Sequence, residues 1–147
     1  MTEDGKAALK RALNMVAYAP NTAAQLRRKL MQKGVRPEAA AEAIEYLERK
    51  GYLNETEYLY RLVSLLGNKK CYGPRRIREQ LRQKGFAREI IENEFSAACE
   101  QVDFVDACRR QLRRKNCADA DKLIAAMLRY GFDYATIREA MKRELAE

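Results

Sequence analysis

The chain has 147 residues, which is the size of one ordinary domain and long enough to bury a core without disulfide or metal staples. Charged residues make up 34% of it, and the net charge of +8 favours a polyanionic partner such as nucleic acid or an acidic protein. Helix-forming residues dominate, and no apolar run approaches the ~20 residues of a membrane span, so we expect an all-α, cytoplasmic protein without membrane attachment.

Periodic apolar residues predict helices over almost the whole chain, in three groups that cover residues 1–51, 52–100 and 101–147. The predicted helices are 5–18, 23–33 and 38–50 in the first group, 55–67, 74–84 and 88–99 in the second, and 104–115, 120–130 and 134–146 in the third.

One pattern occurs once in each group, with two apolar residues, a glycine and a further apolar residue at the same offsets. It lies at residues 26–35, 77–86 and 123–132. Its glycines, Gly34, Gly85 and Gly131, are 51 and 46 residues apart, a period suited to three helices. The predicted fold class is therefore all-α, with three tandem three-helix repeats of right-handed helices stacked into an elongated, curved, solenoid-like rod.

Start and stop signals agree with these ranges. Asn54 followed by Glu57 has the spacing of an N-cap and its third helical residue, and Asp103 followed by Asp106 repeats it. Further caps and first-position prolines are expected at Asp119, Asp133, Pro37 and Pro74. The glycine after each second helix is expected to be a left-handed helix stop, which is a structural role.

The cysteines argue against metal and disulfide chemistry. They stand at positions 71, 99, 108 and 117 with no CxxC pair, and the chain has no histidine. Zinc sites need ligand pairs at short spacing, so we predict no metal. Cys99 and Cys108 are expected in helix cores, and Cys71 and Cys117 in loops.

Motifs of catalysis are missing from the sequence. It has no histidine for base catalysis, no Walker loop and no Gly-x-Ser-x-Gly elbow. The pair Asp119 and Asp121 is explained by helix capping. We therefore expect no enzyme, no catalytic residues, no cofactor and no small-molecule substrate.

The positive charge is concentrated in the second group. From Lys69 to Arg88 there are eight basic residues against one acidic residue. On the helix at 74–84, Ile77 and Leu81 point inward, so arginines beside that seam either recognise a partner or cover apolar surface with their stems. The candidate partner-binding residues are Lys69, Lys70, Tyr72, Arg75, Arg76, Arg78, Arg82 and Lys84.

A secondary basic patch ends the first helix of the third group. Its residues are Arg109, Arg110, Arg113 and Arg114, and Lys115 directly follows them in the same cluster. Positive charge in a last turn suits the helix dipole, but this cluster exceeds what capping needs. We interpret it as a solvated face that adds to binding.

The sequence resembles the RecX family, bacterial regulators of the RecA recombinase. The resemblance depends on Gly51-Tyr-Leu-Asn-Glu-Thr-Glu-Tyr58, on Tyr72-Gly-Pro-Arg-Arg-Ile-Arg-Glu-Gln-Leu-Arg-Gln-Lys-Gly85, on Gln25-Leu-Arg-Arg-Lys-Leu30 with Gly34, and on Tyr130-Gly-Phe132. Two departures, Asn54-Glu55 for two aspartates and Pro20-Asn-Thr-Ala-Ala24 for a serine with acidic residues, keep capping chemistry.

This resemblance implies a non-enzymatic modulator, most simply a negative regulator, that lies in the groove of the RecA filament on single-stranded DNA. It would restrain ATP hydrolysis, strand exchange and LexA cleavage, and the free protein is expected to be a monomer. Two alternatives stay open. One is a helical repeat protein that binds single- or double-stranded nucleic acid directly, where Tyr72 could stack on a base. The other is a helical scaffold for an unrelated partner.

Overall fold

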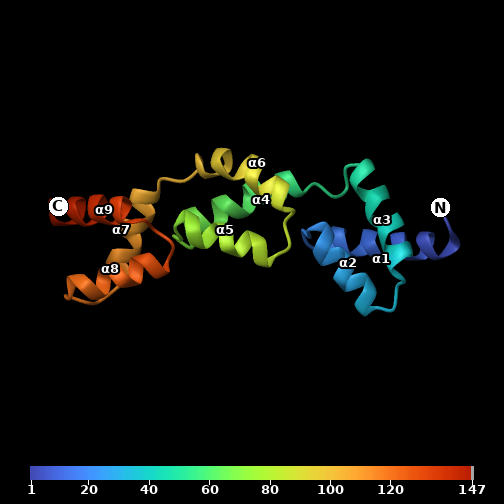
Figure 1. The fold of residues 1–147 in the computed structure, drawn as a ribbon, viewed down its shortest axis with the longest axis horizontal. Coiled ribbons are helices and arrows are strands. Elements are labelled where there is room, and N and C mark those ends of the chain that lie inside the picture. Colours follow the sequence, from blue (N-terminus) through green and yellow to red (C-terminus); the bar gives the residue numbers. More distant parts are fainter. Residues whose placement is uncertain (147) are drawn as a thin grey trace. The chain divides into compact units, whose positions relative to one another are not determined.

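The computed structural model describes residues 1–146, and all of its regular elements over that range are helices, which confirms the all-α class (Figure 1). Its elements are α1 (Glu3–Tyr18), α2 (Ala23–Gln32), α3 (Pro37–Arg49), α4 (Glu55–Ser64), the π-helix η1 (Leu65–Lys69), α5 (Pro74–Gln83), α6 (Arg88–Cys99), α7 (Phe104–Arg114), α8 (Ala120–Arg129) and α9 (Tyr134–Ala146). None of these described helices combines the length and the hydropathy needed to cross a bilayer.

Each predicted helix corresponds to one α-helix, with ends that differ by at most three residues. The largest difference is in the helix predicted at 55–67, which changes to π-helical hydrogen bonding after Ser64 and continues in η1 to Lys69. Apolar periodicity did not reveal this change, because one π-turn shifts the pattern by only a fraction of a turn.

The chain forms two compact units. The first contains Met1–Tyr58 and Arg82–Ile90, and the second contains Leu59–Leu81 and the described residues from Ile91 onward. The predicted boundaries of three repeats, at 1–51, 52–100 and 101–147, stay a prediction.

In the first unit, small side chains let α1 and α3 approach closely. Ala8 and Ala12 of α1 are buried with Ala40 and Ala43 of α3. Leu26 and Leu30 of α2 complete this core, since both are fully buried in the same cluster. Their alignment at i and i+4 is the apolar face that the periodicity predicted.

Thr22 fixes the start of α2. Its Oγ1 accepts the backbone N–H of Gln25 at 3.1 Å, and the Thr22 backbone N–H donates to the Gln25 side chain at 2.9 Å, which together form a capping box. The same hydroxyl donates to the carbonyl of Lys84 at 2.8 Å. The segment Pro20–Ala24 therefore keeps capping chemistry, as expected from its sequence.

Glu55 serves two helix starts within the first unit. Its carboxylate accepts the backbone N–H of Ala23 at 3.2 Å and that of Ala87 at 3.4 Å. These amides begin α2 and precede α6, where unsatisfied donors and the helix dipole favour a carboxylate.

One core cluster of the second unit is built largely from α7, α8 and α9. Its buried residues are Cys71, Ala107, Cys108, Ala126, Met127, Phe132, Ile137 and Ala140. Partly buried side chains such as Ile124 and Leu128 pack against this cluster, which explains why α8 is apolar where α5 carries Arg78 and Arg82.

The predicted caps and stops are confirmed. The side chains of Asn54, Asp103, Asp119 and Asp133 accept backbone N–H groups of the helices that follow them. Pro37 and Pro74 are first helical residues. Gly34, Gly85 and Gly131 have φ of 87°, 89° and 99°, the left-handed conformation expected at these stops.

Candidate partner-binding surface

Helix α5 places its basic residues around a buried seam. Ile77 and Leu81 are fully buried, as predicted, and the half-buried Arg78 places its guanidinium carbon 4.9 Å from the ring centroid of Phe95. Arg78 therefore stabilises the fold through a cation–π contact and covers apolar surface with its stem. Of the two interpretations offered for the arginines beside the seam, covering apolar surface is the one that fits Arg78.

Arg76 makes a second contact of this kind. Its guanidinium carbon lies 4.0 Å from the ring centroid of Tyr72 and 5.4 Å from that of Tyr130. The two rings are stacked with centroids 6.2 Å apart and planes inclined by 19°. Tyr72 and Arg76 are thus brought together, and Tyr130, which the sequence had not marked as a binding residue, joins them.

The loop before α5 is held by backbone bonds. The N–H of Gly73 donates to the carbonyl of Tyr130 at 2.8 Å, and the N–H of Arg75 donates to that of Gly131 at 3.2 Å. Cys71 lies in this loop, as predicted, but it is fully buried and has φ of 58°. A non-glycine residue in this conformation is uncommon.

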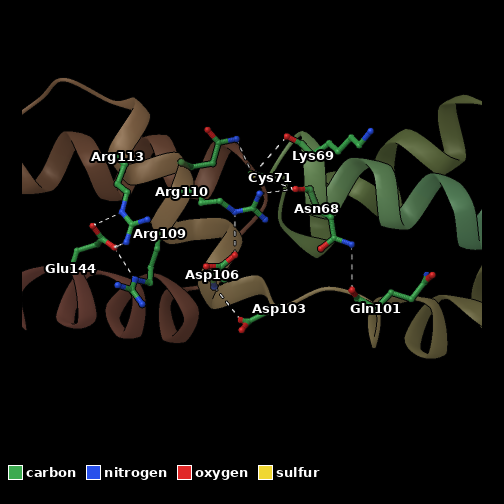
Figure 2. A network of polar contacts seen from close by, with 11 residues as sticks. Asn68, Lys69, Cys71, Gln101, Asp103, Asp106, Arg109, Arg110, Arg113 and Glu144 are labelled. Carbon is green, nitrogen blue, oxygen red and sulfur yellow. Dashed lines mark hydrogen bonds and ion pairs between the residues drawn. The ribbon is translucent and has the colours of Figure 1, made fainter. Parts of the chain in front are cut away.

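Side chains of α7 bind the carbonyl groups at the end of η1 (Figure 2). The amide Nε2 of Gln111 donates to the carbonyls of Lys70 and Cys71 at 2.8 and 2.9 Å, and Nη1 of Arg110 donates to that of Asn68 at 2.7 Å. Gln111 is only 4% exposed, so these bonds are shielded from water. The network fixes the segment that carries the exposed Lys69 and Lys70.

The secondary patch is largely engaged within the chain (Figure 2). Arg109 Nε is 2.7 Å from Glu144 Oε1, and Arg113 Nη2 is 2.9 Å from the same oxygen. Arg110 pairs with Asp106 at 3.1 Å in addition to its bond to Asn68. Hydrogen bonds from Arg113 and Arg109 hold the pKa of Glu144 below its ordinary value.

These contacts limit what the secondary patch can offer a partner. A cation whose charge is already balanced by a carboxylate attracts another anion less strongly than an unpaired one. Arg114 is exposed. Of the four arginines in this patch, it fits the interpretation as a solvated face best.

The other candidate residues differ in exposure. Lys69, Lys70 and Arg75 of the second unit are exposed. In the first unit Arg82 is exposed, and Lys84 is half-buried with its carbonyl bound by Thr22.

Cys71, Cys108 and Cys117 are placed as the sequence indicated, whereas Cys99 is the last residue of α6 and is half-buried, not a core residue. Cys108 is buried, and burial raises the pKa of its thiol to about 12; burial likewise raises that of the half-buried Cys99 to about 11. Few thiolates exist at neutral pH when the pKa is this high, so neither thiol is activated. Cys117 is exposed, and within residues 1–146 no three side chains are grouped as a metal site would require.

The sequence missed Tyr130, Lys115 and Gln111 as neighbours of the basic segment. Lys115 Nζ lies 5.2 Å from the Tyr130 ring centroid, and Gln111 binds the end of η1. Gln111 is 40 and 41 positions from the loop residues that it binds, Tyr130 is 58 positions from Tyr72, and Lys115 is 15 positions from Tyr130. The one local signal was the tyrosine immediately before the helix-stop glycine.

The fold and this surface define an all-α protein with a basic helix, α5, near the middle of its sequence. Models of two RecX domains match the chain: the first three-helix domain at residues 8–47 and the second at residues 54–93. The chain belongs to the RecX family.

Curated relatives agree. The chain is 32% identical over 104 residues to the regulatory protein RecX of Trichlorobacter lovleyi, covering 71% of this chain and 68% of the relative. It is 33% identical over 117 residues to that of Cronobacter sakazakii, covering 73% and 69%. With that of Chlorobaculum tepidum the identity is 29% over 151 residues, covering 99% and 94%.

The fold is similar to that of a crystal structure of RecX from Lactobacillus salivarius, with a TM-score of 0.83, 20% identity and coverage of 97% of both chains. The chain is therefore a member of a family of regulatory proteins and has their helical fold.

Proposed function

We propose that this protein is a negative regulator of RecA that binds in the groove of the RecA filament on single-stranded DNA and restrains ATP hydrolysis, strand exchange and LexA cleavage. Membership in a family whose relatives are called regulatory proteins carries the proposal. The division of the chain into three helical repeats, at residues 1–51, 52–100 and 101–147, is part of the same proposal.

The basic segment supports this function physically. Lys69, Lys70 and Arg75 are exposed between the end of η1 and the start of α5. Hydrogen bonds to the rest of the second unit fix the path of this segment. Positive residues held in one arrangement steer and orient an acidic partner without a large loss of side-chain freedom on binding. A filament of protein on DNA is such a partner.

An ATPase titration tests the proposal. Purified protein is added in increasing amounts to RecA, single-stranded DNA and ATP, and phosphate release is followed. We expect turnover to fall at concentrations well below one regulator per RecA subunit, since a protein lodged in the groove contacts several subunits. Unchanged turnover at every ratio would refute the inhibitory function.

Direct nucleic-acid binding is the alternative, and the exposed Lys69, Lys70 and Arg75 are the observation that favours it. If the protein neutralised about six phosphates, its affinity for labelled oligonucleotides without RecA would fall roughly 10³-fold between about 50 and 200 mM salt. We expect instead a weak response with a shallow salt dependence, and a steep one would establish nucleic acid as the primary ligand.

A further inference from the structure

Two cations and two aromatic rings from four different segments of the second unit form one cluster, which we call the tyrosine–cation cluster. Its members are Tyr72 before α5, Arg76 in α5, Lys115 after α7, and Tyr130 after α8. Arg76 contacts both rings, at 4.0 and 5.4 Å from their centroids, and Lys115 contacts Tyr130 at 5.2 Å.

The cations of this cluster have no acidic partner within residues 1–146. This distinguishes Lys115 from Arg109 and Arg113, which lie in the preceding helix and share the carboxylate of Glu144. A cation over an aromatic face keeps its N–H groups available, because the ring is contacted through its π-electrons. Arg76 and Lys115 can therefore still donate hydrogen bonds to an anion.

The cluster is also preorganised. Backbone bonds from Gly73 to Tyr130 and from Arg75 to Gly131 join the segments that carry the two rings. Tyr72, Arg76 and Tyr130 are half-buried and contact one another before any partner arrives, whereas Lys115 is exposed and contacts Tyr130 alone. Binding then costs less side-chain entropy than it would for four independent residues.

The chemistry favours a protein over a nucleic-acid strand. Single-stranded nucleic acid is bound by stacking its bases on open aromatic faces. Here the two rings stack on each other, and Arg76 and Lys115 occupy positions over them. The guanidinium of Arg76 and the ammonium group of Lys115 can donate hydrogen bonds to carboxylates. The half-buried rings of the two tyrosines can contact an apolar side chain beside them.

We propose that the tyrosine–cation cluster binds an acidic segment on the protein surface of the RecA filament, so that Lys115 and Tyr130 extend the contact surface beyond the basic segment around α5. This inference rests on the proposed function. It assigns a partner-binding role to Tyr130, which the sequence had left outside the candidate site, and a defined place in the contact to Lys115, which the sequence had grouped with the secondary basic patch.

The test compares Lys115→Glu with Lys122→Glu. Both lysines are exposed in the second unit, and both variants change the net charge equally. Glutamate at position 122 lies in the first turn of α8, where a negative charge is tolerated. We expect Lys115→Glu to weaken binding to the RecA filament about five-fold or more, and Lys122→Glu to change it less than about two-fold.

Arg76→Lys is the second variant, since it retains the charge but loses the planar fork. It should also weaken filament binding while circular dichroism at 222 nm stays unchanged. If wild-type protein binds the filament and all three variants bind equally well, the inference is wrong and the proposed function stands. If wild-type protein does not bind, both are wrong.

Binding to labelled single-stranded DNA without RecA shows whether the cluster binds the DNA phosphates or an acidic segment of the protein. The Lys122→Glu variant measures how much the loss of positive charge alone weakens DNA binding. We expect the DNA affinity of Lys115→Glu to lie within about two-fold of that of Lys122→Glu. An equal loss on DNA and on the filament would make phosphate the ligand and overturn the assignment to an acidic protein segment.

Discussion

The role of each arginine in this protein depends on which group lies opposite its guanidinium. Arg78 lies over Phe95, Arg76 over two tyrosines, and Arg109 against the carboxylate of Glu144. A guanidinium over a ring keeps its N–H donors and an unbalanced charge, whereas one paired with a carboxylate has given that carboxylate some of its donors and has its charge balanced. Counting basic residues therefore overstates the charge that a partner can reach.

The pair of arginines on Glu144 predicts a dependence of stability on pH. The pKa of Glu144 is below its ordinary value of 4.5 because Arg113 and Arg109 donate hydrogen bonds to the ionised form. A lowered pKa in the folded state means that the stabilisation is present above the ordinary pKa and is lost as pH falls through the folded value. Glu144→Gln should therefore be less stable than wild type at about pH 7, and the difference should shrink towards about pH 3.

Urea unfolding followed by circular dichroism at both pH values measures this difference. Glu139→Gln is the matched control, since Glu139 pairs with Arg143 in a more exposed contact, with side-chain exposures of 51% for Arg143 and 44% for Glu139. Exposed pairs contribute little, so its effect should be small at either pH. A Glu144→Gln difference that is the same at both pH values would contradict the assignment of this ion pair.

At the scale of elements, the three helix-stop glycines share a conformation but differ in surroundings. A Cβ at Gly34 would meet nothing within 4 Å, whereas one at Gly131 would lie 2.5 Å from the backbone nitrogen and 2.6 Å from the Cβ of Arg76. Gly131 is thus a stop and also a packing position against the first turn of α5.

Alanine substitution should separate these two roles. Gly34→Ala should cost about 1 kcal/mol through its left-handed backbone alone. Gly131→Ala should cost about 1–3 kcal/mol more, because backbone atoms of α5 have to move. Urea midpoints for the two variants measure the difference, and equal losses would mean that the contact between Gly131 and Arg76 yields without cost.

The helices were predictable from sequence because caps, proline positions and apolar periodicity are local signals. Asn54, Asp119 and Pro74 each act within one turn of their own position. The difference between Gly34 and Gly131, and the burial of Cys71, were not predictable in this way. Both depend on residues distant in sequence, and only the folded chain shows which backbone lies opposite.

The same limit applies to the candidate surface. That residues 69–88 are basic can be read directly, and Ile77 and Leu81 were correctly predicted to be buried. Which cations stay accessible could not be predicted, because Phe95, Tyr130 and Glu144 come from other helices or their ends.

For the whole molecule, the net charge of +8 has to be divided into cations that stabilise the chain and cations that can reach a partner. Replacing Arg78 would disturb the cover of Phe95 and confuse folding with binding. Lys69, Lys70 and Arg75 are exposed in the second unit and avoid this difficulty. They are the residues whose charge can be reversed to test recognition.

The triple variant Lys69→Glu, Lys70→Glu, Arg75→Glu should keep its helicity, lose about ten-fold or more in affinity for the RecA filament, and show a flatter dependence on salt than wild type. Its control reverses Lys10, Arg11 and Arg36, which are exposed in the first unit and change the net charge equally. If overall charge alone attracted the protein to the filament, both variants would lose affinity to the same extent. A loss confined to the first variant would instead assign recognition to the segment around η1 and α5, because both variants change the net charge equally and only the first removes the cations of that segment.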